Sequence, residues 1–159
     1  MKKYLFLLML PIMIMAAAPQ AKAQYNNAIG LRLGPSWGIT FKHKMSEKAG
    51  LEFLLNSHWG GFQVTAMYEH HIPVITDGMN FYFGGGGHIG FYNYNSRYDR
   101  YWNNYGGGMY IGADGIIGLE YTFSEVPINL SLDWKPAFNF VGNTGFWGDG
   151  GALSVRYAF

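Results

Sequence analysis

The sequence predicts an all-β fold, an eight-stranded antiparallel transmembrane β-barrel with up-and-down topology. Three observations support this prediction. The final residues alternate, with Leu153, Val155, Tyr157 and Phe159 on one parity and small or charged residues on the other, which is the period of a strand with two unlike faces. Similar stretches recur between short turn clusters, with no amphipathic helical period among them. The chain also begins with an export signal.

The export signal has the three parts of a signal peptide. Residues 1–3 are basic at two positions, residues 4–18 are apolar, and residues 21–23 form a small-x-small cleavage site. We therefore expect residues 1–23 to be removed and residues 24–159 to form one barrel domain. The apolar run is shorter than the roughly 20 residues of a spanning helix, so strands must hold the chain in a membrane.

The composition excludes several classes of protein. Aromatic residues make up 18% of the chain, charged residues only 13%, and glycine occurs 23 times. These values suit a barrel with aromatic girdles and curved strands. The absence of cysteine excludes a disulfide-stapled domain and a lipid anchor on an N-terminal cysteine. No basic patch is present, so nucleic acid is not an expected partner.

Strand signals alternate with turn residues along the chain. An even number of strands returns both ends of the chain to the periplasmic side, which puts residue 35 and residues 59–61, 94–108 and 142–149 outside the cell. The first two strands are shorter than the roughly 9 to 11 residues that a tilted spanning strand needs, and fusing them would leave seven. Pro136 interrupts the seventh strand and predicts a bulge there. The expected strands are residues 27–34, 37–44, 49–58, 62–71, 79–93, 109–123, 126–141 and 150–159.

The apolar parity of each strand is expected to face lipid, because a lysine or arginine at mid-bilayer costs about 2 to 4 kcal/mol. The opposite parity collects five bases and five acids. Equal numbers favour an ion-pair network that fills the bore. An eight-stranded bore is only wide enough for side chains, so we expect a plugged barrel without an aqueous channel. The predicted network is Arg32, Lys42, Lys44, Glu52, Glu69, Asp114, Glu120, Asp133, Lys135 and Arg156.

Histidines offer a metal or acid–base site as an alternative. His70 and His71 are adjacent in a strand and point to opposite faces, so they cannot share one ion. His58, His71 and His88 share the inward parity with Glu52 and Glu69. Because polar lumen residues need partners anyway, structural pairing is the favoured interpretation. We therefore assign no metal ligand, no cofactor and no catalytic residue.

Two other functional classes stay open. An enzyme that modifies lipid A would need a serine, a histidine and an acid together at the lipid face or outer rim. Ser57 points outward but His58 points inward, while His43 and His70 lie at the opposite end, so this is the minority hypothesis. A soluble periplasmic barrel that carries lipid would exchange the two parities. The bulky apolar set does not fit inside an eight-stranded bore, which disfavours that alternative.

The loop at residues 94–108 is the most informative polar stretch. Its tyrosine, tryptophan, arginine and asparagine residues suit a recognition surface for an extracellular ligand or for lipid phosphates. A girdle extension in the headgroup layer is an equal alternative. The predicted recognition residues are Arg97, Tyr98, Arg100, Tyr101 and Trp102.

The mature chain resembles small outer-membrane barrels of the OmpA-transmembrane-domain and OmpX kind. Residues 68–73, 131–139 and 144–151 are also similar to barrels of Bacteroidota, and the terminal Phe159 resembles their closing strand. The resemblance implies the outer membrane of a Gram-negative bacterium, contact with outer-membrane lipids and lipopolysaccharide, and insertion by the barrel assembly machinery. It implies no catalytic residue. Unlike for the OmpA type, we expect no C-terminal peptidoglycan-binding domain, so anchoring to the cell wall is not implied.

Overall fold

The computed structural model describes residues 25–58, 60–74, 76–92, 108–142 and 144–159. No helix in these ranges is long and apolar enough to cross a membrane. The strands are β1 (Asn27–Leu33), β2 (Trp37–Lys44), β3 (Ala49–His58), β4 (Gly61–Pro73), β5 (Met79–Tyr92), β6 (Gly108–Thr122), β7 (Ile128–Trp134), β8 (Ala137–Val141), β9 (Gly145–Trp147) and β10 (Gly151–Ala158).

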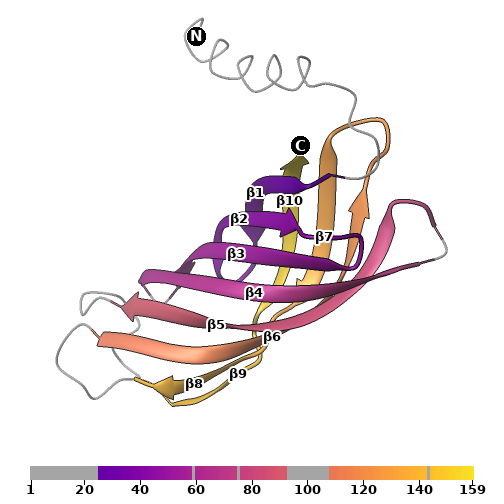
Figure 1. Cartoon of the computed structure of the whole chain (residues 1–159). Coiled ribbons are helices and arrows are strands. Elements are labelled where there is room, and N and C mark those ends of the chain that lie inside the picture. The colour runs from indigo at the N-terminus through magenta and orange to yellow at the C-terminus, as the bar shows by residue number, and fades with distance from the viewer. Residues whose placement is uncertain (1–24, 59, 75, 93–107, 143) are drawn as a thin grey trace, which may run out of the picture.

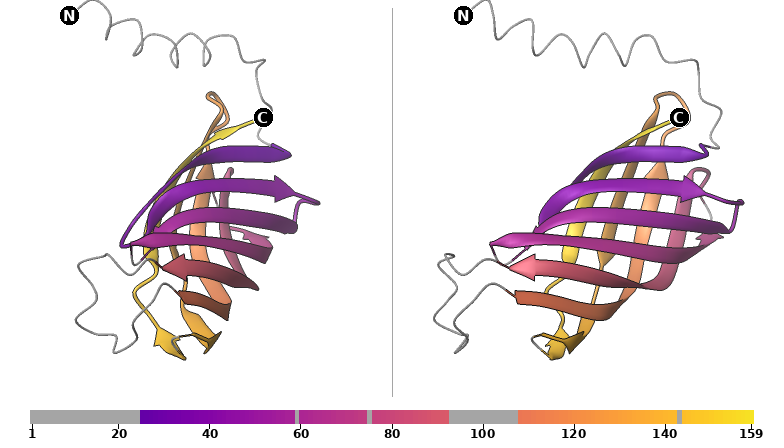
Figure 2. Two further views of the ribbon diagram at one scale, coloured as in Figure 1. Left: turned by 90° about the vertical axis from the view of Figure 1, so that its left-hand side faces the viewer. Right: turned by 60° about the vertical axis from the view of Figure 1, so that its left-hand side comes forward.

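The ten labelled segments form a closed antiparallel barrel of eight strands, because two of the barrel strands are each divided into two segments (Figure 1, Figure 2). β1 to β6 pair in chain order, and β6 pairs next with β7 and β8. β10 pairs with both β7 and β1, which closes the sheet. β7 and β8 are successive parts of the seventh strand, and β9 and β10 are parts of the eighth. The predicted eight-stranded barrel is therefore confirmed.

The barrel has two ends that are named here for what they carry. The terminal end holds Tyr25, Phe159 and the turns at residues 45–48, 76–78 and 123–127. The loop end holds the turns at residues 34–36, the end of β5 and the start of β6. β1 and β2 are separate strands joined at the loop end and paired over six positions. The count of eight, which depended on this separation, stands.

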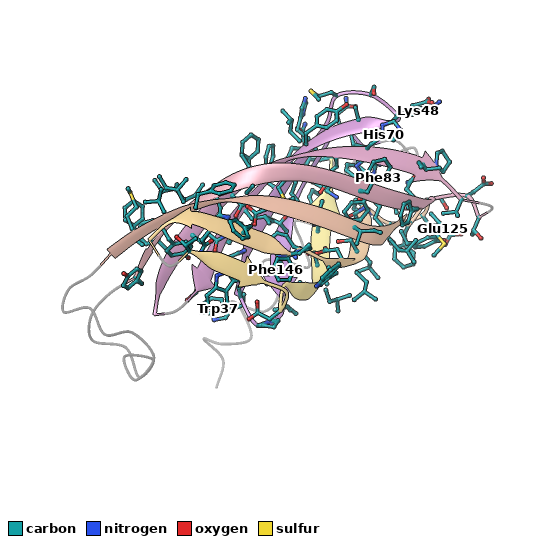
Figure 3. All side chains as sticks on the ribbon, turned by 90° about the horizontal axis from the view of Figure 1, so that it is seen from below. Trp37, Lys48, His70, Phe83, Glu125 and Phe146 are labelled. Carbon is teal, nitrogen blue, oxygen red and sulfur yellow. The ribbon has the colours of Figure 1, made fainter. Side chains whose placement is uncertain are left out.

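Side chains alternate between the outer surface and the bore, as the sequence parity predicted. On β10, Leu153 and Val155 are 45% and 42% exposed, whereas Arg156 is 1% exposed. Glu120 and Asp133 are likewise buried. The exposed surface is thus apolar and the interior is charged, the reverse of a soluble protein (Figure 3).

The interruption at Pro136 differs from the predicted bulge. Trp134 pairs with Ile117 and Ala137 with Asp114, so the register is unchanged across the proline. The Gly115 amide donates to the Pro136 carbonyl at 2.9 Å, which keeps the sheet continuous on that side. The register shift lies further along, where β8 passes Ile111 and Gly112 of β6. A proline at a strand break needs no bulge, because only its missing N–H must be accommodated.

The segment predicted as a connection, residues 142–149, contains the strand β9. β9 pairs with β8 and begins the eighth strand before β10 does. Trp134 Nε1 donates to the Gly148 carbonyl at 2.7 Å, and the Lys135 amide donates to the Gly150 carbonyl at 3.1 Å. These contacts hold the chain against its neighbour between β9 and β10, although its glycines gave no strand signal.

Glycines on β5 and β6 make room for large side chains in the bore. A Cβ at Gly90 would lie 2.0 Å from Tyr110 Cζ, so only glycine leaves space for that ring. Every one of six consecutive inward pairs combines a glycine with a larger residue. The pairs are Tyr82–Gly118, Gly84–Ile116, Gly86–Asp114, His88–Gly112, Gly90–Tyr110 and Tyr92–Gly108.

Candidate functional site

The polar bore is the candidate functional site, and its largest group of charges surrounds Lys42. Lys42 Nζ lies 2.8 Å from Glu69 Oε2, 3.1 Å from Glu120 Oε2 and 4.0 Å from Glu52 Oε2. All four side chains are fully buried and come from β2, β3, β4 and β6. One ammonium thus joins four strands, and removing it would take one positive charge away from three buried carboxylates.

Arg156 on β10 extends this group across the barrel. Its guanidinium pairs with Glu52 and donates to Thr40 Oγ1 at 3.0 Å, Asn129 Oδ1 at 3.1 Å and Ser131 Oγ at 2.8 Å. Thr40 Oγ1 in turn donates to Glu52 Oε1 at 2.5 Å. The planar guanidinium has several fixed donors, so one buried arginine satisfies acceptors on three strands.

Lys44 and His71 complete the group toward the terminal end. Lys44 Nζ lies 2.9 Å from Glu120 Oε1 and 4.4 Å from the centre of the Tyr25 ring. His71 sits between carboxylates, with Nε2 3.2 Å from Glu69 and Nδ1 3.4 Å from Glu120. We call this set the terminal-end cluster. It consists of Lys42, Lys44, Glu52, Glu69, His71, Glu120 and Arg156.

Tyr25 covers the terminal-end cluster from outside the strands. Its hydroxyl donates to Glu120 Oε1 at 3.1 Å and accepts from Asn129 Nδ2 at 3.1 Å. Burial raises the pKa of the Tyr25 hydroxyl well above its usual value, and the nearby Glu120 carboxylate raises it further. The phenol therefore stays protonated and keeps its donor role.

A second ion pair lies between Arg32 on β1 and Asp133 on β7. The two terminal guanidinium nitrogens of Arg32, Nη1 and Nη2, both donate to the carboxylate, with Nη1 2.9 Å from Oδ2. Tyr82 donates to the same Oδ2 at 2.9 Å and stacks on His71, with ring centres 5.4 Å apart. Tyr82 belongs to an apolar group with Leu54, Met67 and Ile116. The bore therefore also contains a small hydrophobic core, which the parity argument did not predict.

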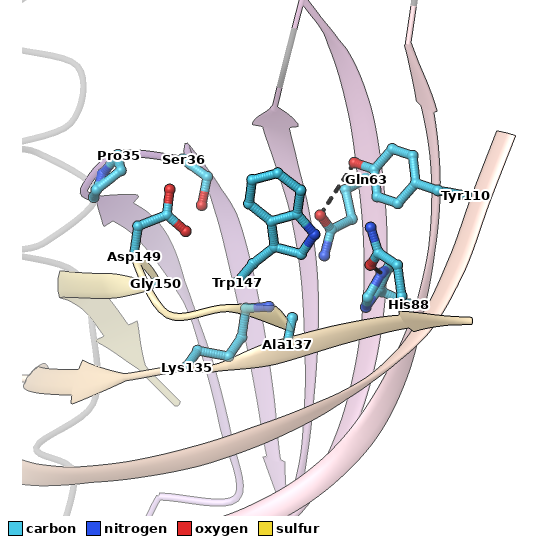
Figure 4. Close-up of a pocket in the computed structure, with 11 residues that line it drawn as sticks. Pro35, Ser36, Gln63, His88, Tyr110, Lys135, Ala137, Trp147, Asp149 and Gly150 are labelled. Atoms are coloured by element: carbon cyan, nitrogen blue, oxygen red, sulfur yellow. Dashed lines mark hydrogen bonds between the residues drawn. The ribbon is translucent and has the colours of Figure 1, made fainter. Parts of the chain in front are cut away.

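A third group, here called the loop-end cluster, consists of His88, Asp114, Lys135 and Asn139. Asp114 pairs with Lys135 Nζ and with His88 Nδ1, the latter at 2.6 Å. His88 Nε2 lies 2.9 Å from Asn139 Oδ1. His88, Lys135 and Asn139 line a cavity of about 30 Å³ near the loop end, together with Trp147 and Asp149 (Figure 4).

All ten charged residues predicted for the bore point inward, and the structure joins them in these three groups. Sequence reasoning missed the neutral partners Thr40, Tyr82, Asn129, Ser131 and Asn139. Their inward parity was the available signal, because each stands between outward apolar residues. The predicted recognition residues Arg97, Tyr98, Arg100, Tyr101 and Trp102 lie outside the described residues.

The structure places His43 and His70 away from Ser57, the serine considered for a lipid-modifying site. His70 lies on the outer surface with its ring centre 5.6 Å from that of Phe83, and His43 contacts Asn27 Oδ1 at 2.8 Å. Both belong to the terminal end, whereas Ser57 is near the loop end. Within the described residues, no group of three or more histidines and acids is placed to hold a metal ion.

The comparisons with known proteins agree with the barrel. No protein-family model and no curated protein matches the sequence. The structure is similar to the N-terminal β-barrel domain of Pseudomonas aeruginosa OprF, with a TM-score of 0.64 and 16% identity, over 85% of this chain and 98% of that domain. The fold class is therefore that of an OmpA-type eight-stranded barrel, as the resemblance implied. At this identity the likeness concerns the fold alone.

Proposed function

We propose that the protein is an integral outer-membrane β-barrel whose bore is closed by its own side chains. The observation that carries the proposal is the reversal of polarity between surface and interior. Leucine, isoleucine, phenylalanine and tryptophan are exposed along every long strand, while ten charged side chains turn inward. An apolar belt of this extent needs a hydrocarbon solvent, because exposure to water would drive aggregation.

The aromatic residues support a membrane position. Phe81, Phe83, Tyr121 and Phe123 gather on the outer surface toward the terminal end, and the Tyr121 and Phe123 rings are 4.8 Å apart. Phe62 and Phe91 form a second contact toward the loop end, with ring centres 5.1 Å apart. Two aromatic belts separated by aliphatic residues suit two membrane interfaces. This also disfavours the soluble lipid-carrying alternative, whose bore would have to be apolar.

The ion pairs support a plugged bore. Lys42, Arg156 and Arg32 each bridge strands across the interior, and each pairs there with a buried carboxylate. The protein would then act as a structural element or as a scaffold for recognition through residues 94–108. Lipopolysaccharide, outer-membrane lipids and the barrel assembly machinery are the partners that this proposal requires.

Cell fractionation with heat-dependent gel mobility tests the location. We expect the unheated protein in the outer-membrane fraction, migrating as a compact band that shifts on boiling. Recovery in the soluble periplasm would refute the proposal. Protease treatment of intact cells should cut at Arg97 or Arg100 if residues 94–108 are outside. Planar-bilayer recordings should show no steady conductance if the bore is plugged.

A further inference from the structure

The barrel wall has a step where the first and eighth strands meet. A row of strand partners begins at Ile29 on β1, passes through β2 to β8, and ends at Phe146 on β9. Ile29 itself pairs with Tyr157 on β10, eleven residues further along the eighth strand than Phe146. One circuit of the sheet therefore climbs eleven residues, because the strands are tilted and staggered around the barrel axis.

The step opens toward the loop end. At the terminal end the two strands finish together, since the Asn27 amide donates to the Phe159 carbonyl at 2.9 Å. Toward the loop end the pairing of β1 with β10 stops at Leu33 and Leu153, because the chain turns at residues 34–36 and returns as β2. Within the described residues β9 pairs with β8 only, and it lies apart from β1 (Figure 1). The eighth strand thus extends beyond β1 with one open edge.

The depth of the step follows from the lengths of the first two strands and from the proposed outer-membrane location, on which this inference rests. β1 and β2 have seven and eight residues, whereas a tilted spanning strand needs about 9 to 11. Their outward side chains are apolar up to the turn itself, since Leu33 is 52% and Trp37 is 65% exposed. The turn at residues 34–36 therefore lies below the outer membrane surface, and the open edge of the eighth strand begins at that depth.

An open strand edge is not stable in hydrocarbon, because its N–H and C=O groups find no partners there. Such an edge is tolerated at membrane depth only where it lines a polar cavity. The loop-end cavity supplies one, because it extends from the bore to the step. Its lining includes Gln63 and Lys135 inside the bore and Pro35, Ser36 and Asp149 at the step (Figure 4). The step is therefore a polar opening in an apolar wall.

The groups at the step suit a headgroup that both donates and accepts hydrogen bonds. An open strand edge carries N–H donors and C=O acceptors, which sugar hydroxyls satisfy in turn. Asp149 is exposed there and accepts from hydroxyls, while the Ser36 hydroxyl can donate to a phosphate oxygen. Leu33, Trp37 and Phe146 offer an exposed apolar surface for acyl chains. We propose that the step binds the headgroup of a phosphorylated glycolipid, lipopolysaccharide, which enters sideways from the outer leaflet.

Fluorescent labels on single cysteines test the position of the step in the full barrel, because the chain has no cysteine of its own. Pro35→Cys places a label at the step, and Leu33→Cys places one on the lipid-facing side of β1. In vesicles that contain phosphatidylcholine brominated along its acyl chains, we expect the lipid to quench both labels. Quenching at Leu33→Cys but not at Pro35→Cys would overturn the proposal and leave the membrane location intact. Loss of quenching at both would refute the membrane location as well.

Purified lipopolysaccharide, added to the same vesicles, tests the occupant. We expect it to displace the brominated lipid from Pro35→Cys at lower amounts than from Leu33→Cys, where it only dilutes the bulk lipid. Asp149→Asn should weaken this displacement by about two- to tenfold, the contribution of one hydrogen bond. Asp77→Asn, in an exposed turn at the terminal end, is the matched control and should keep it. Parallel displacement at both labels, or cross-linking of two Pro35→Cys barrels in place of lipid contact, would overturn the assignment to a glycolipid.

Discussion

Gly112 on β6 lies directly opposite His88 on β5, and the imidazole fills the space that a side chain at Gly112 would need. A Cβ at this position would come within 2.6 Å of His88 Cε1 and 2.3 Å of the Phe138 carbonyl oxygen. The second of these contacts is with backbone, which cannot rotate away. The position of the loop-end cluster therefore depends on Gly112, which forms none of its polar contacts but leaves space for the His88 ring.

Gly112→Ala should destabilise the barrel by about 1 to 3 kcal/mol, because overpacking forces the neighbouring strand or ring to move. Urea unfolding in lipid vesicles, followed by tryptophan fluorescence, measures this. Gly85→Ala is the matched control on the same pair of strands, since its nearest contact would be 3.4 Å, an ordinary packing distance. Equal midpoints for the two variants would contradict the packing argument.

Lys42→Met should lower the free energy of unfolding by about 3 to 5 kcal/mol, because three buried carboxylates lose the ammonium that they share. The measurement is again urea unfolding in vesicles. Lys48→Met, in the exposed turn between β2 and β3, is the control and should unfold like the wild type.

A second substitution tests whether charge or volume causes the loss. Adding Glu69→Gln to Lys42→Met removes the carboxylate that lies nearest to the lost ammonium, without changing the shape of the side chain. We expect it to recover part of the loss, with a coupling of about 0.5 to 3 kcal/mol between the two sites. Purely additive effects would show that Lys42 acts through packing alone.

The barrel was predictable because a charge on one parity excludes that face from lipid along the whole strand. Arg156 alone fixes which side of the closing strand is inside, and Lys42 does the same for the second strand. The details near Pro136 were not predictable in this way. The position of the register shift and the pairing of β9 depend on long-range contacts such as Trp134 with Gly148, which no local pattern shows.

The members of the ion-pair network followed from parity, but their partners did not. Arg32 meets Asp133, which is 101 positions away, and Arg156 meets Glu52, 104 positions away. Each pairing depends on the stagger between strands around the closed barrel, and this stagger has no local signature in the sequence. Neutral partners such as Thr40 were still harder to predict, because an uncharged hydroxyl can lie on either face of a strand.

Val155→Lys tests the membrane position of the outer surface. Val155 lies near the middle of β10, is 42% exposed, and pairs with Leu31 and Leu130. In vesicles, a lysine there should cost about 2 to 4 kcal/mol of unfolding free energy if the site faces the bilayer midplane. Val126→Lys, at a similarly exposed valine in a terminal-end turn, should cost far less. Comparable costs at both positions would argue against a membrane-spanning belt.

Tyr25→Phe should change how stability depends on alkaline pH. The pKa of Tyr25 is raised above its ordinary value of 10.0, first by burial and then by Glu120, so the folded state holds this proton more tightly than the unfolded chain. The resulting stability is fully present below the unfolded pKa and is lost as pH rises through about 10 toward the folded pKa. The wild type should therefore lose up to about 1.4 kcal/mol per pH unit more than Tyr25→Phe in that range. The free energy of unfolding, measured by urea titration at about four evenly spaced pH values between pH 8 and pH 12, gives both slopes. Parallel slopes would mean that the Tyr25 phenol is not held against Glu120 in the folded barrel.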